Sequence, residues 1–142
     1  MKLQILSFEW NKFENEKVQS FTIMTKAWEI TVLDNHEALI TAIEPWTIEI
    51  NILEDSEEKT EFFAIWKWVI EISDSKSKIM TNMLLWVWEV DLEQAEQAKA
   101  KALELMEKAK ADKNKIDMEK YLEAEEQLAK SMAKMKLHEL KK

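Results

Sequence analysis

Glycine, cysteine and arginine are absent from this chain of 142 residues, and proline occurs only once. Without cysteine, the chain can form no disulfide, supplies no thiolate nucleophile and offers no thiolate ligand to zinc. Without glycine, it can contain no glycine-rich loop of the kind that cradles phosphate groups. An average chain of this length has about ten glycines, so their complete absence is a real anomaly of composition.

Long apolar runs and an excess of positive charge are also missing. No uninterrupted apolar stretch approaches the roughly 20 residues of a membrane-spanning helix. The opening stretch, MKLQILSFEW, does not resemble a secretory signal. The formal net charge of −8 disfavours binding to nucleic-acid phosphates or to anionic lipid surfaces. We therefore expect no nucleic-acid binding and no direct membrane insertion, and the simplest role of the charge is solubility.

Residues that carry catalysis or bind metals form no recognisable group. His36 and His138 are far apart in the sequence and have no metal-ligand spacing. The serines lie in acidic, turn-like stretches without a nucleophile motif, and any one of the 28 acidic residues is most simply a solvated side chain. The sequence therefore predicts no catalytic residue, no metal and no cofactor in this chain.

Short strand-like segments follow one another through residue 90. Apolar and β-branched runs recur at short spacing, as KLQILSF, VQSFTIMT, EITVL, ALITAI, TIEINILE, FFAIW, VIEIS and KIMTN. Within TIEINILE, the residues Ile48, Ile50 and Ile52 alternate with their neighbours at the period of a half-buried strand. Because no helical pattern separates the runs, we predict an all-β N-terminal sandwich of about ten short antiparallel strands over residues 1–88.

The composition changes abruptly at Asp91, where strong helix formers replace β-branched residues. Asp91 is a suitable N-cap for a first helix, and a second helix is expected to begin at Asp117 with Ile116 and Tyr121 at hydrophobic-staple positions. The short break DKNK between the helices requires them to run antiparallel. We therefore predict a C-terminal antiparallel α-helical hairpin within residues 89–142.

Each expected helix carries one stripe of small and apolar residues at helical spacing. The stripe of the first helix comprises Ala95, Ala98, Ala102, Leu105 or Met106, and Ala109. The stripe of the second comprises Tyr121, Ala124 or Glu125, Leu128, Met132 and Met135. Two such helices have little core of their own, so the hairpin should be marginally stable unless it docks on something. It is therefore a candidate for a mobile regulatory element.

Charge divides at the same boundary. Residues 1–90 carry 8 Lys against 16 acidic residues, whereas residues 91–142 carry 12 of each. The helices hold Glu104–Lys108 and Glu126–Lys130 at the i,i+4 spacing and in the orientation that favours ion pairing. We therefore expect an acidic sandwich and a helical hairpin that is neutral overall.

The stretch WEITVLDNHEALITAIEPWTIEI, residues 28–50, resembles the signature of the epsilon subunit of F-type ATP synthases. The matching positions are Trp28, Ile30, Val32, Leu33, His36, Leu39, Ile40, Thr41, Ile43, Pro45 and Trp46. The segments KLQILSFEWNKFENE, FFAIWKWVIEIS and VDLEQAEQAKAKA resemble other parts of that family, so the resemblance covers the whole chain. It implies the same order of sandwich and hairpin that the residue patterns predict.

The resemblance also implies a function and partners. Epsilon subunits are non-catalytic rotor subunits of the central stalk, bound to the gamma subunit and to the c-ring, which couple proton-driven rotation to ATP synthesis. The implied location is the cytoplasmic face of the plasma membrane, peripherally, in the F1 sector. Carried over by position, Glu29 in the loop after Trp28 and His36 on the neighbouring turn are candidates for the c-ring contact. For His36, bracing of its turn is an equally simple role.

The helical hairpin of the family can extend along gamma and restrain ATP hydrolysis. In that state the hairpin meets the alpha and beta subunits. Lys130, Lys134 and Lys136 are candidates for contact with an acidic surface of the beta subunits, although lysines near a helix C-terminus also complement the helix dipole. Some members bind ATP through an (I/L)-D-x-x-R-A motif. The corresponding residues here are Val90, Asp91, Gln94 and Ala95, and the arginine is missing. Nucleotide binding at Asp91, Gln94 and Ala95 is therefore doubtful.

Seven tryptophans fall at or near turns where the family has glycine or tolerates it, namely Trp10, Trp28, Trp46, Trp66, Trp68, Trp86 and Trp88. UGA is read as tryptophan in some genetic codes and as glycine in others. We hypothesise that these letters are glycine in the living protein, because tryptophan at seven glycine-like turns would cost on the order of 1 kcal/mol each. The alternative is that tryptophan is genuine, and reading the seven codons decides between them.

Two other functions are compatible with parts of the sequence. One is a free-standing β-sandwich interaction module with a helical tail, which would be stable alone and have no affinity for a gamma subunit. The other is a small-ligand or enzymatic domain, which would require a polar pocket that the sequence does not reveal. A gene directly after that of the beta subunit, or co-purification with gamma, would favour the rotor subunit.

Overall fold

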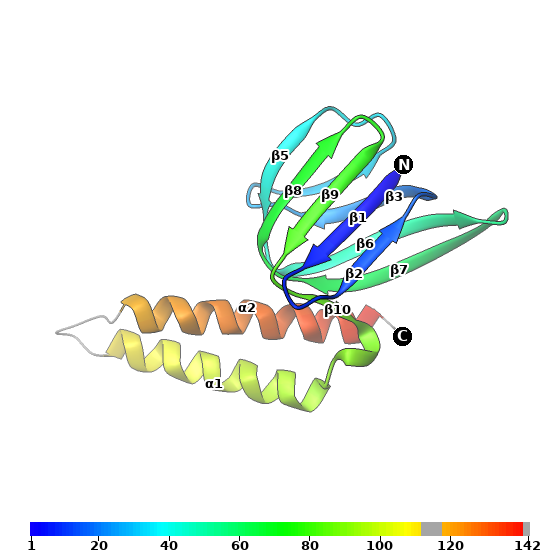
Figure 1. The fold of residues 1–142 in the computed structure, drawn as a ribbon. Helices are drawn as coiled ribbons and strands as arrows, with labels where there is room; N and C mark the ends of the chain where they lie inside the picture. The colour runs from blue at the N-terminus through cyan, green and yellow to red at the C-terminus, as the bar shows by residue number, and fades with distance from the viewer. Residues whose placement is uncertain (112–117, 141–142) are drawn as a thin grey trace.

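The computed structural model describes residues 1–111 and 118–140. A two-sheet sandwich is followed by two long helices that form a hairpin beside it (Figure 1). The strands are β1 (Lys2–Ser7), β2 (Lys12–Asn15), β3 (Val18–Met24), β4 (Glu29–Leu33), β5 (Leu39–Ile43), β6 (Trp46–Glu54), β7 (Glu57–Ile65), β8 (Trp68–Ser73), β9 (Lys76–Thr81) and β10 (Leu84–Trp86). A 3₁₀ turn, η1 (Val87–Glu89), leads to α1 (Leu92–Ala111) and α2 (Met118–Leu140).

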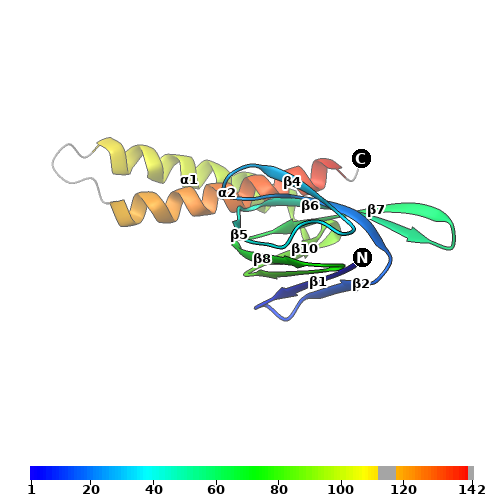
Figure 2. The same cartoon turned by 90° about the horizontal axis from the view of Figure 1, so that it is seen from above.

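The two sheets have five strands each and lie face to face (Figure 2). Sheet A has the order β2-β1-β9-β8-β5, and sheet B has the order β10-β7-β6-β3-β4. The predicted sandwich is confirmed, with one correction to its strand pairing. β1 runs parallel to β9, whereas the sequence predicted antiparallel strands only. A parallel pair needs a long crossover rather than a tight turn, and here the whole of β2 to β8 supplies it.

Strand alternation places one continuous core between the sheets. The three isoleucines of TIEINILE, Ile48, Ile50 and Ile52, are buried, as their spacing predicted. Phe21 and Phe63 are the largest fully buried side chains of this core. The predicted number of about ten strands is confirmed, although β2 and β10 are not among the apolar runs, because they have only four and three residues. Asn11 joins these two sheet edges, since its Nδ2 donates to the Leu84 carbonyl oxygen at 2.7 Å.

Polar residues take the backbone conformations that glycine usually fills. Positive φ angles occur at Asn35, Asp55, Ser56 and Asp74, and also at Trp10. Asn35 has a φ of 61°, a left-handed conformation that asparagine tolerates better than most residues. The sandwich therefore makes most of its left-handed turns with short polar side chains.

The helical hairpin begins where the sequence predicted. The Asp91 carboxylate accepts a hydrogen bond from the Gln94 backbone N–H at 3.1 Å, so Asp91 is the N-cap of α1. The expected ion pair Glu104–Lys108 is present at 3.0 Å. The expected staple of Ile116 and Tyr121, and the start at Asp117, involve residues outside the described ones.

The buried face of α1 differs from the expected stripe at one position. Ala95 and Ala102 are buried, but Ala98 is exposed and Lys99 lies on the partly buried face instead. Of the two alternatives at the next turn, Met106 is partly buried and Leu105 is exposed, so Met106 belongs to the stripe. On α2, Ala124 is buried, whereas Glu125 and Met132 are exposed. The contact face therefore advances in alternating steps of three and four residues, the 3.5-residue repeat of paired helices.

Helix α2 has a second packing face, which rests on the sandwich. Figure 1 shows α2 between the sandwich and α1. It contacts β6 and β7 of sheet B, and Figure 2 shows the hairpin on the sheet B side of the molecule. The outer face of sheet A is therefore left uncovered by the hairpin. Among the described residues, no helix is long and apolar enough to cross a membrane.

Glu14 on β2 provides a pH-dependent contribution to sheet A. Hydrogen bonds and charges from Lys12 and Lys2, at 2.8 Å and 2.7 Å, lower the pKa of Glu14 to about 2. A lowered carboxyl pKa stabilises the fold above the unfolded value near 4.5 and loses that contribution as pH falls through about 2. We expect urea unfolding to show a shallower loss of stability between pH 5 and 2 in Glu14→Gln than in the wild type. Identical slopes would contradict this assignment.

Candidate functional site

An apolar row crosses four strands on the outer face of sheet A. Strand register places Leu6 of β1 beside Met80 of β9, Met80 beside Val69 of β8, and Val69 beside Ala42 of β5. Each has a buried neighbour on its strand, namely Ile5, Ile43, Ile70 and Ile79, so these four side chains point outward. We call these four residues the apolar row. None of them is fully buried.

Ile40 extends the apolar row on the same face, and two large exposed aromatic side chains lie at the end of the sheet. Ile40 on β5 is 71% exposed. Phe8 and Trp68 are 60% and 51% exposed and contact each other edge to face, with ring centroids 5.0 Å apart. Contiguous exposed apolar surface on a soluble protein commonly marks a site of protein–protein contact. The outer face of sheet A is therefore the first candidate functional surface of this chain.

The second candidate surface is the contact between α2 and the sandwich, which we call the hairpin dock. Its buried centre is formed by Ala64, Trp66 and Met83 of the sandwich with Leu137 of α2. Ala133 of α2 is also fully buried. The small alanine lets the helix approach closely, and the large Leu137 and Trp66 side chains supply most of the apolar contact.

Polar contacts border the hairpin dock. Lys67 of the β7–β8 turn forms an ion pair with Glu126 of α2, and the Lys130 ammonium lies 5.8 Å from the centre of the Trp66 ring. The sequence prediction that Glu126 pairs with Lys130 is therefore wrong. Both residues face the sandwich and find partners there, because α2 docks through the face that carries them.

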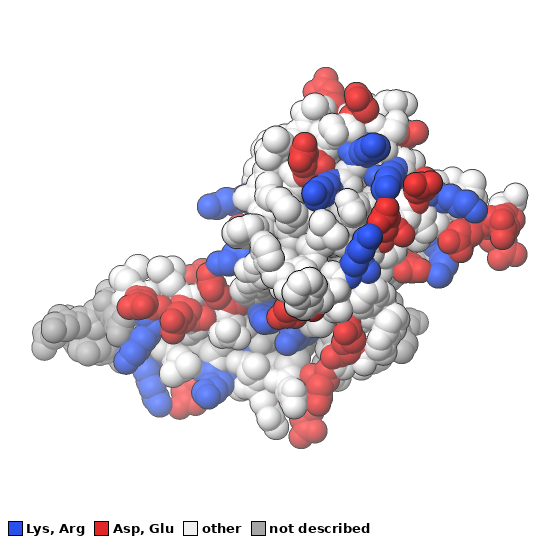
Figure 3. All heavy atoms as spheres, in the orientation of Figure 1, with Lys and Arg blue, Asp and Glu red and all other residues white. Residues whose placement is uncertain are grey.

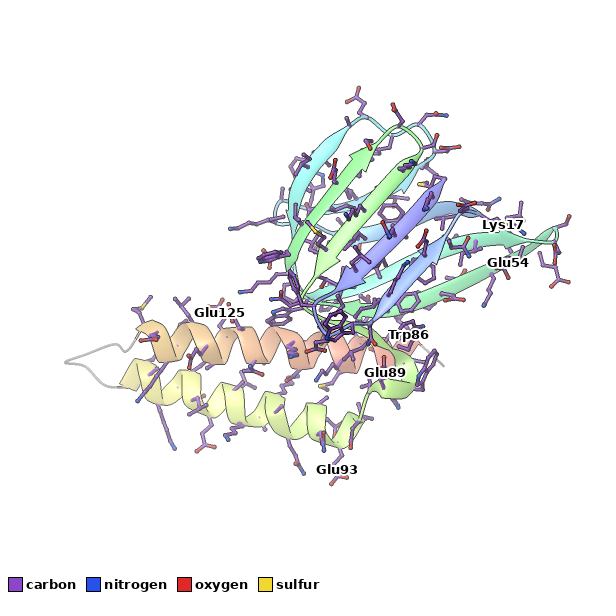
Figure 4. The ribbon with its side chains drawn as sticks, viewed as in Figure 1. Lys17, Glu54, Trp86, Glu89, Glu93 and Glu125 are labelled. Atoms are coloured by element: carbon purple, nitrogen blue, oxygen red, sulfur yellow. The ribbon has the colours of Figure 1, made fainter. Side chains whose placement is uncertain are left out.

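The joint between the sandwich and α1 is a short braced segment. The backbone N–H of Trp86 donates to the Glu89 carboxylate at 2.8 Å, and the Trp86 and Trp88 rings stack with centroids 5.5 Å apart. Figure 4 shows Trp86 and Glu89 at this joint, beside the start of α1. The predicted division at residues 88 and 89 falls within η1.

Comparison with protein families identifies the first part of the chain. The model described as "ATP synthase, Delta/Epsilon chain, beta-sandwich domain" matches residues 1–87. The chain belongs to this family. The match ends within η1, so it covers the whole sandwich and stops before the helices. No curated protein matches the chain in a direct sequence search.

Solved structures share the complete fold of this delta/epsilon family member. A chain of the Euglena gracilis mitochondrial ATP synthase (OSCP/F1/c-ring, rotational state 1) is 19% identical, with a TM-score of 0.71 over 92% of this chain and 76% of that one. A chain of the Tetrahymena thermophila mitochondrial ATP synthase central stalk/c-ring is 10% identical, with a TM-score of 0.63 over 97% and 96%. At such low identity, the likeness concerns the fold.

The two residues expected at the c-ring contact do not lie together. Glu29 is the first residue of β4 rather than part of a loop, and His36 follows the other end of that strand. The intervening residues of an extended strand span about 3.3 Å each, so the two sites lie at opposite ends of β4. The prediction that Glu29 lies in a loop is wrong, whereas the assignment of the two residues to the c-ring contact stays a prediction. His36 Nδ1 lies 2.7 Å from the Glu37 carbonyl oxygen, a contact that braces its turn.

The three late lysines take part in contacts of the docked hairpin. Lys130 covers Trp66. Burial, and then the charge of Lys130, lower the pKa of Lys134, while Glu9 acts in the opposite direction. Lys136 lies 3.9 Å from Glu139 and lines an open pocket of about 380 Å³, together with Trp46, Leu92, Lys99, Met132, Met135, His138 and Glu139. The docked hairpin therefore does not present these lysines as one free basic surface.

Two of the residues at the positions of the nucleotide motif have structural roles in α1. Asp91 caps the helix, Gln94 is exposed, and Ala95 is buried in the hairpin. These roles account for Asp91 and Ala95 without a nucleotide. No group of three or more metal-ligating side chains occurs among the described residues.

The seven tryptophans occupy different backbone environments. The structure describes all seven tryptophans. Trp10, with a φ of 71°, is the one among them that has a positive φ. Trp46 begins β6 directly after Pro45 with no left-handed backbone, so the expectation of a glycine-like turn there is wrong. Trp28, Trp66, Trp68, Trp86 and Trp88 lie at strand ends, in a turn or in η1. Backbone strain therefore supports the glycine hypothesis at Trp10 alone, and the codons remain its test.

Substitution of Trp10 by glycine should stabilise the chain. The side chain is 95% exposed, so little packing is lost, while the left-handed backbone becomes unstrained. We expect a gain of about 1 kcal/mol in the free energy of unfolding. Trp28→Gly is the matched control, because Trp28 is also exposed but lacks positive φ. An equal gain from both variants, measured by urea unfolding, would contradict the assignment.

Proposed function

We propose that this chain is a non-catalytic rotor subunit in the central stalk of an F-type ATP synthase, where it takes part in coupling c-ring rotation to ATP synthesis. The observation that carries the proposal is the family match over residues 1–87. The arrangement of sandwich and hairpin supports it, because a chain of the Tetrahymena thermophila central stalk/c-ring has the same arrangement along almost its whole length.

The sandwich binds the gamma subunit and the c-ring in this proposal. The apolar row with Ile40, and Phe8 and Trp68 at the end of the sheet, offer a broad surface for gamma, and the hairpin leaves that surface open. Contact with the c-ring requires one end of the sandwich. Because Glu29 and His36 lie at opposite ends of β4, only one of them belongs to it. The chain sits peripherally in the F1 sector, on the cytoplasmic face of the plasma membrane.

The hairpin restrains ATP hydrolysis by leaving its dock and extending along gamma. Only α2 forms the buried centre of the hairpin dock, through Leu137. The remaining attachments include the exposed Lys67–Glu126 ion pair, and an exposed pair contributes at most about 1 kcal/mol. Release frees Lys130, Lys134 and Lys136 to contact acidic surfaces of the alpha and beta subunits. The structure of the dock thus supports a detachable hairpin.

A reversible cross-link tests this proposal. The chain has no cysteine, so Lys67→Cys with Glu126→Cys gives a unique pair of thiols across the hairpin dock. A bismaleimide with a reducible linker then holds the hairpin in place. We expect the reconstituted complex to hydrolyse ATP severalfold faster with the linker intact than after its reduction, because the held hairpin cannot extend.

The control is Lys59→Cys with Glu61→Cys, a second ion pair within β7 that does not involve the hairpin. Its cross-link should leave hydrolysis unchanged. Equal rates before and after reduction in the dock variant would contradict restraint by extension while leaving the stalk assignment intact. Failure of the wild-type chain to bind gamma would contradict the rotor function itself.

A further inference from the structure

The outer face of sheet A carries a group of lysines beside the apolar row. Lys76 and Lys78 lie on β9 on the same face as Met80, and register places Lys2 beside Lys76 and Gln4 beside Lys78. We call Lys2, Lys76 and Lys78 the lysine cluster. Figure 3 shows basic side chains on the upper part of this face, with acidic side chains among them, above a largely uncharged band.

Two members of the lysine cluster lack a carboxylate partner. Lys2 pairs with Glu14 at 2.7 Å and with Glu16 at 3.8 Å. For Lys76 and Lys78, the described residues provide no ion pair within 4.0 Å, although Glu71 is the register neighbour of Lys78. Both lysines lie in a sandwich whose residues 1–90 include 16 acids against 8 lysines. Lys76 and Lys78 therefore place positive charge beside the apolar row.

A hollow lies among these lysines. It has a volume of about 230 Å³ and is lined by Lys2, Gln4, Glu71, Ser73, Lys76, Ser77 and Lys78. Its rim supplies lysine ammonium groups, the Ser73 hydroxyl and the Gln4 amide, which can donate hydrogen bonds, together with the Glu71 carboxylate, which can only accept them. A carboxylate side chain from another protein is of a suitable size and charge to enter it, and it would complete the partners of Lys76 and Lys78.

The apolar row and the lysine cluster are close enough for one helix of a partner to contact both. Lys76 and Met80 lie four residues apart on β9, which corresponds to about 13 Å along a strand. An α-helix with its side chains is about 10–12 Å wide. A helix laid across the strands would therefore place one flank on the apolar row and the other flank on the lysine cluster.

We infer that the outer face of sheet A binds a partner surface that presents an apolar strip bordered on one side by carboxylates, with the strip on the apolar row and an acidic side chain in the hollow. This inference rests on the proposed function, which makes gamma the partner, and it adds the chemistry by which gamma is held. The apolar row supplies contact area, and the lysine cluster fixes the orientation, because charge pairs set register and speed association.

The test titrates the purified gamma subunit of the same complex onto the full-length chain by biolayer interferometry. Lys76→Glu with Lys78→Glu should weaken binding by about tenfold or more and reduce its dependence on salt. Met80→Lys should also weaken binding, because it places a charge in the apolar row. The matched control is Lys17→Glu with Lys59→Glu, which makes the same change in net charge away from this face and should alter Kd by less than about twofold.

The possible outcomes separate this inference from the proposed function. Binding by the wild type that neither the lysine variant nor Met80→Lys weakens would overturn the inference alone. Equal weakening by the lysine variant and its control would also overturn it, since only net charge would then matter. Absence of any binding by the wild type overturns both. A dimer in sedimentation that Met80→Lys abolishes would make a second copy the occupant and would overturn the inference as well. Circular dichroism and urea unfolding of each variant confirm that the fold is retained.

Discussion

Replacing Trp66 by glycine should release the hairpin from the sandwich while leaving the sandwich folded. Trp66 is only 7% exposed and lies in the buried centre of the hairpin dock with Leu137. Loss of a large buried aromatic side chain typically costs about 3–5 kcal/mol. The cost falls on the dock, because the Trp66 ring contacts α2 and the Lys130 ammonium lies over it.

Hydrogen exchange is the appropriate measurement for Trp66→Gly. An undocked two-helix hairpin is marginally stable, so amide protection in α1 and α2 should fall by roughly a hundredfold or more, as about 3 kcal/mol implies. Protection of the core strands should stay the same. Trp68→Gly is the control, because Trp68 is about half exposed and packs on Phe8 rather than on the hairpin. Unchanged protection in α2 would show that Trp66 does not hold the dock.

This result bears directly on the glycine hypothesis. If the codon at position 66 specifies glycine in the source organism, the natural chain lacks the largest side chain of the dock, and its hairpin is correspondingly looser. The same reassignment at position 10 would relieve a left-handed backbone. Glycine at all seven positions would therefore stabilise the sandwich turn at position 10 and weaken the hairpin dock at position 66.

Phe63→Ala should destabilise the sandwich more than any exposed substitution. Phe63 is fully buried, and its ring contacts Phe13 at 5.1 Å and Trp86 at 5.3 Å between centroids. We expect a loss of about 3–5 kcal/mol in the free energy of unfolding, which is a large part of the 5–15 kcal/mol (a rough range) typical of a domain. Phe63 therefore ties the two sheets together at the edge where β2 meets β10.

Urea unfolding monitored by circular dichroism measures the effect of Phe63→Ala. Phe8→Ala is the matched control, since Phe8 is mostly exposed and touches only a partly exposed ring. We expect it to cost less than about 1 kcal/mol. Comparable losses from the two variants would mean that Phe63 contributes no more than a surface aromatic, which would contradict the buried contacts described above.

Local patterns predicted most elements of this fold because each carries its own period. The isoleucines of β6 alternate, and the residues after Asp91 follow a helical repeat. Pairing between distant strands has no such local signal, which explains why the parallel pairing of β1 with β9 was missed. The error at Ala98 and Lys99 has another cause, since the aliphatic stem of a lysine can cover an apolar interface as well as alanine does.

The candidate sites were harder to predict than the fold. Glu29 and His36 are only seven positions apart in the sequence, but an extended strand separates them in space. Glu126 faces Lys67, a partner that only the docking of α2 can bring near. The apolar row went unnoticed because each strand contributes one outward residue to it, such as Leu6 or Met80, and only the strand register joins them. A surface assembled across strands leaves little trace in any single segment.

The first strand lies inside sheet A rather than at its edge, and this position determines when the sandwich can form. β1 lies between β2 and β9, and the Met1 ammonium donates to the Val18 carbonyl oxygen at 2.8 Å. During synthesis the first strand is made early, but its neighbour β9 follows only at residues 76–81. Closing that long loop makes assembly of sheet A slow, whereas the hairpin forms from nearby residues. During synthesis, β1 therefore remains without its partner strand β9 until most of the sandwich has been made.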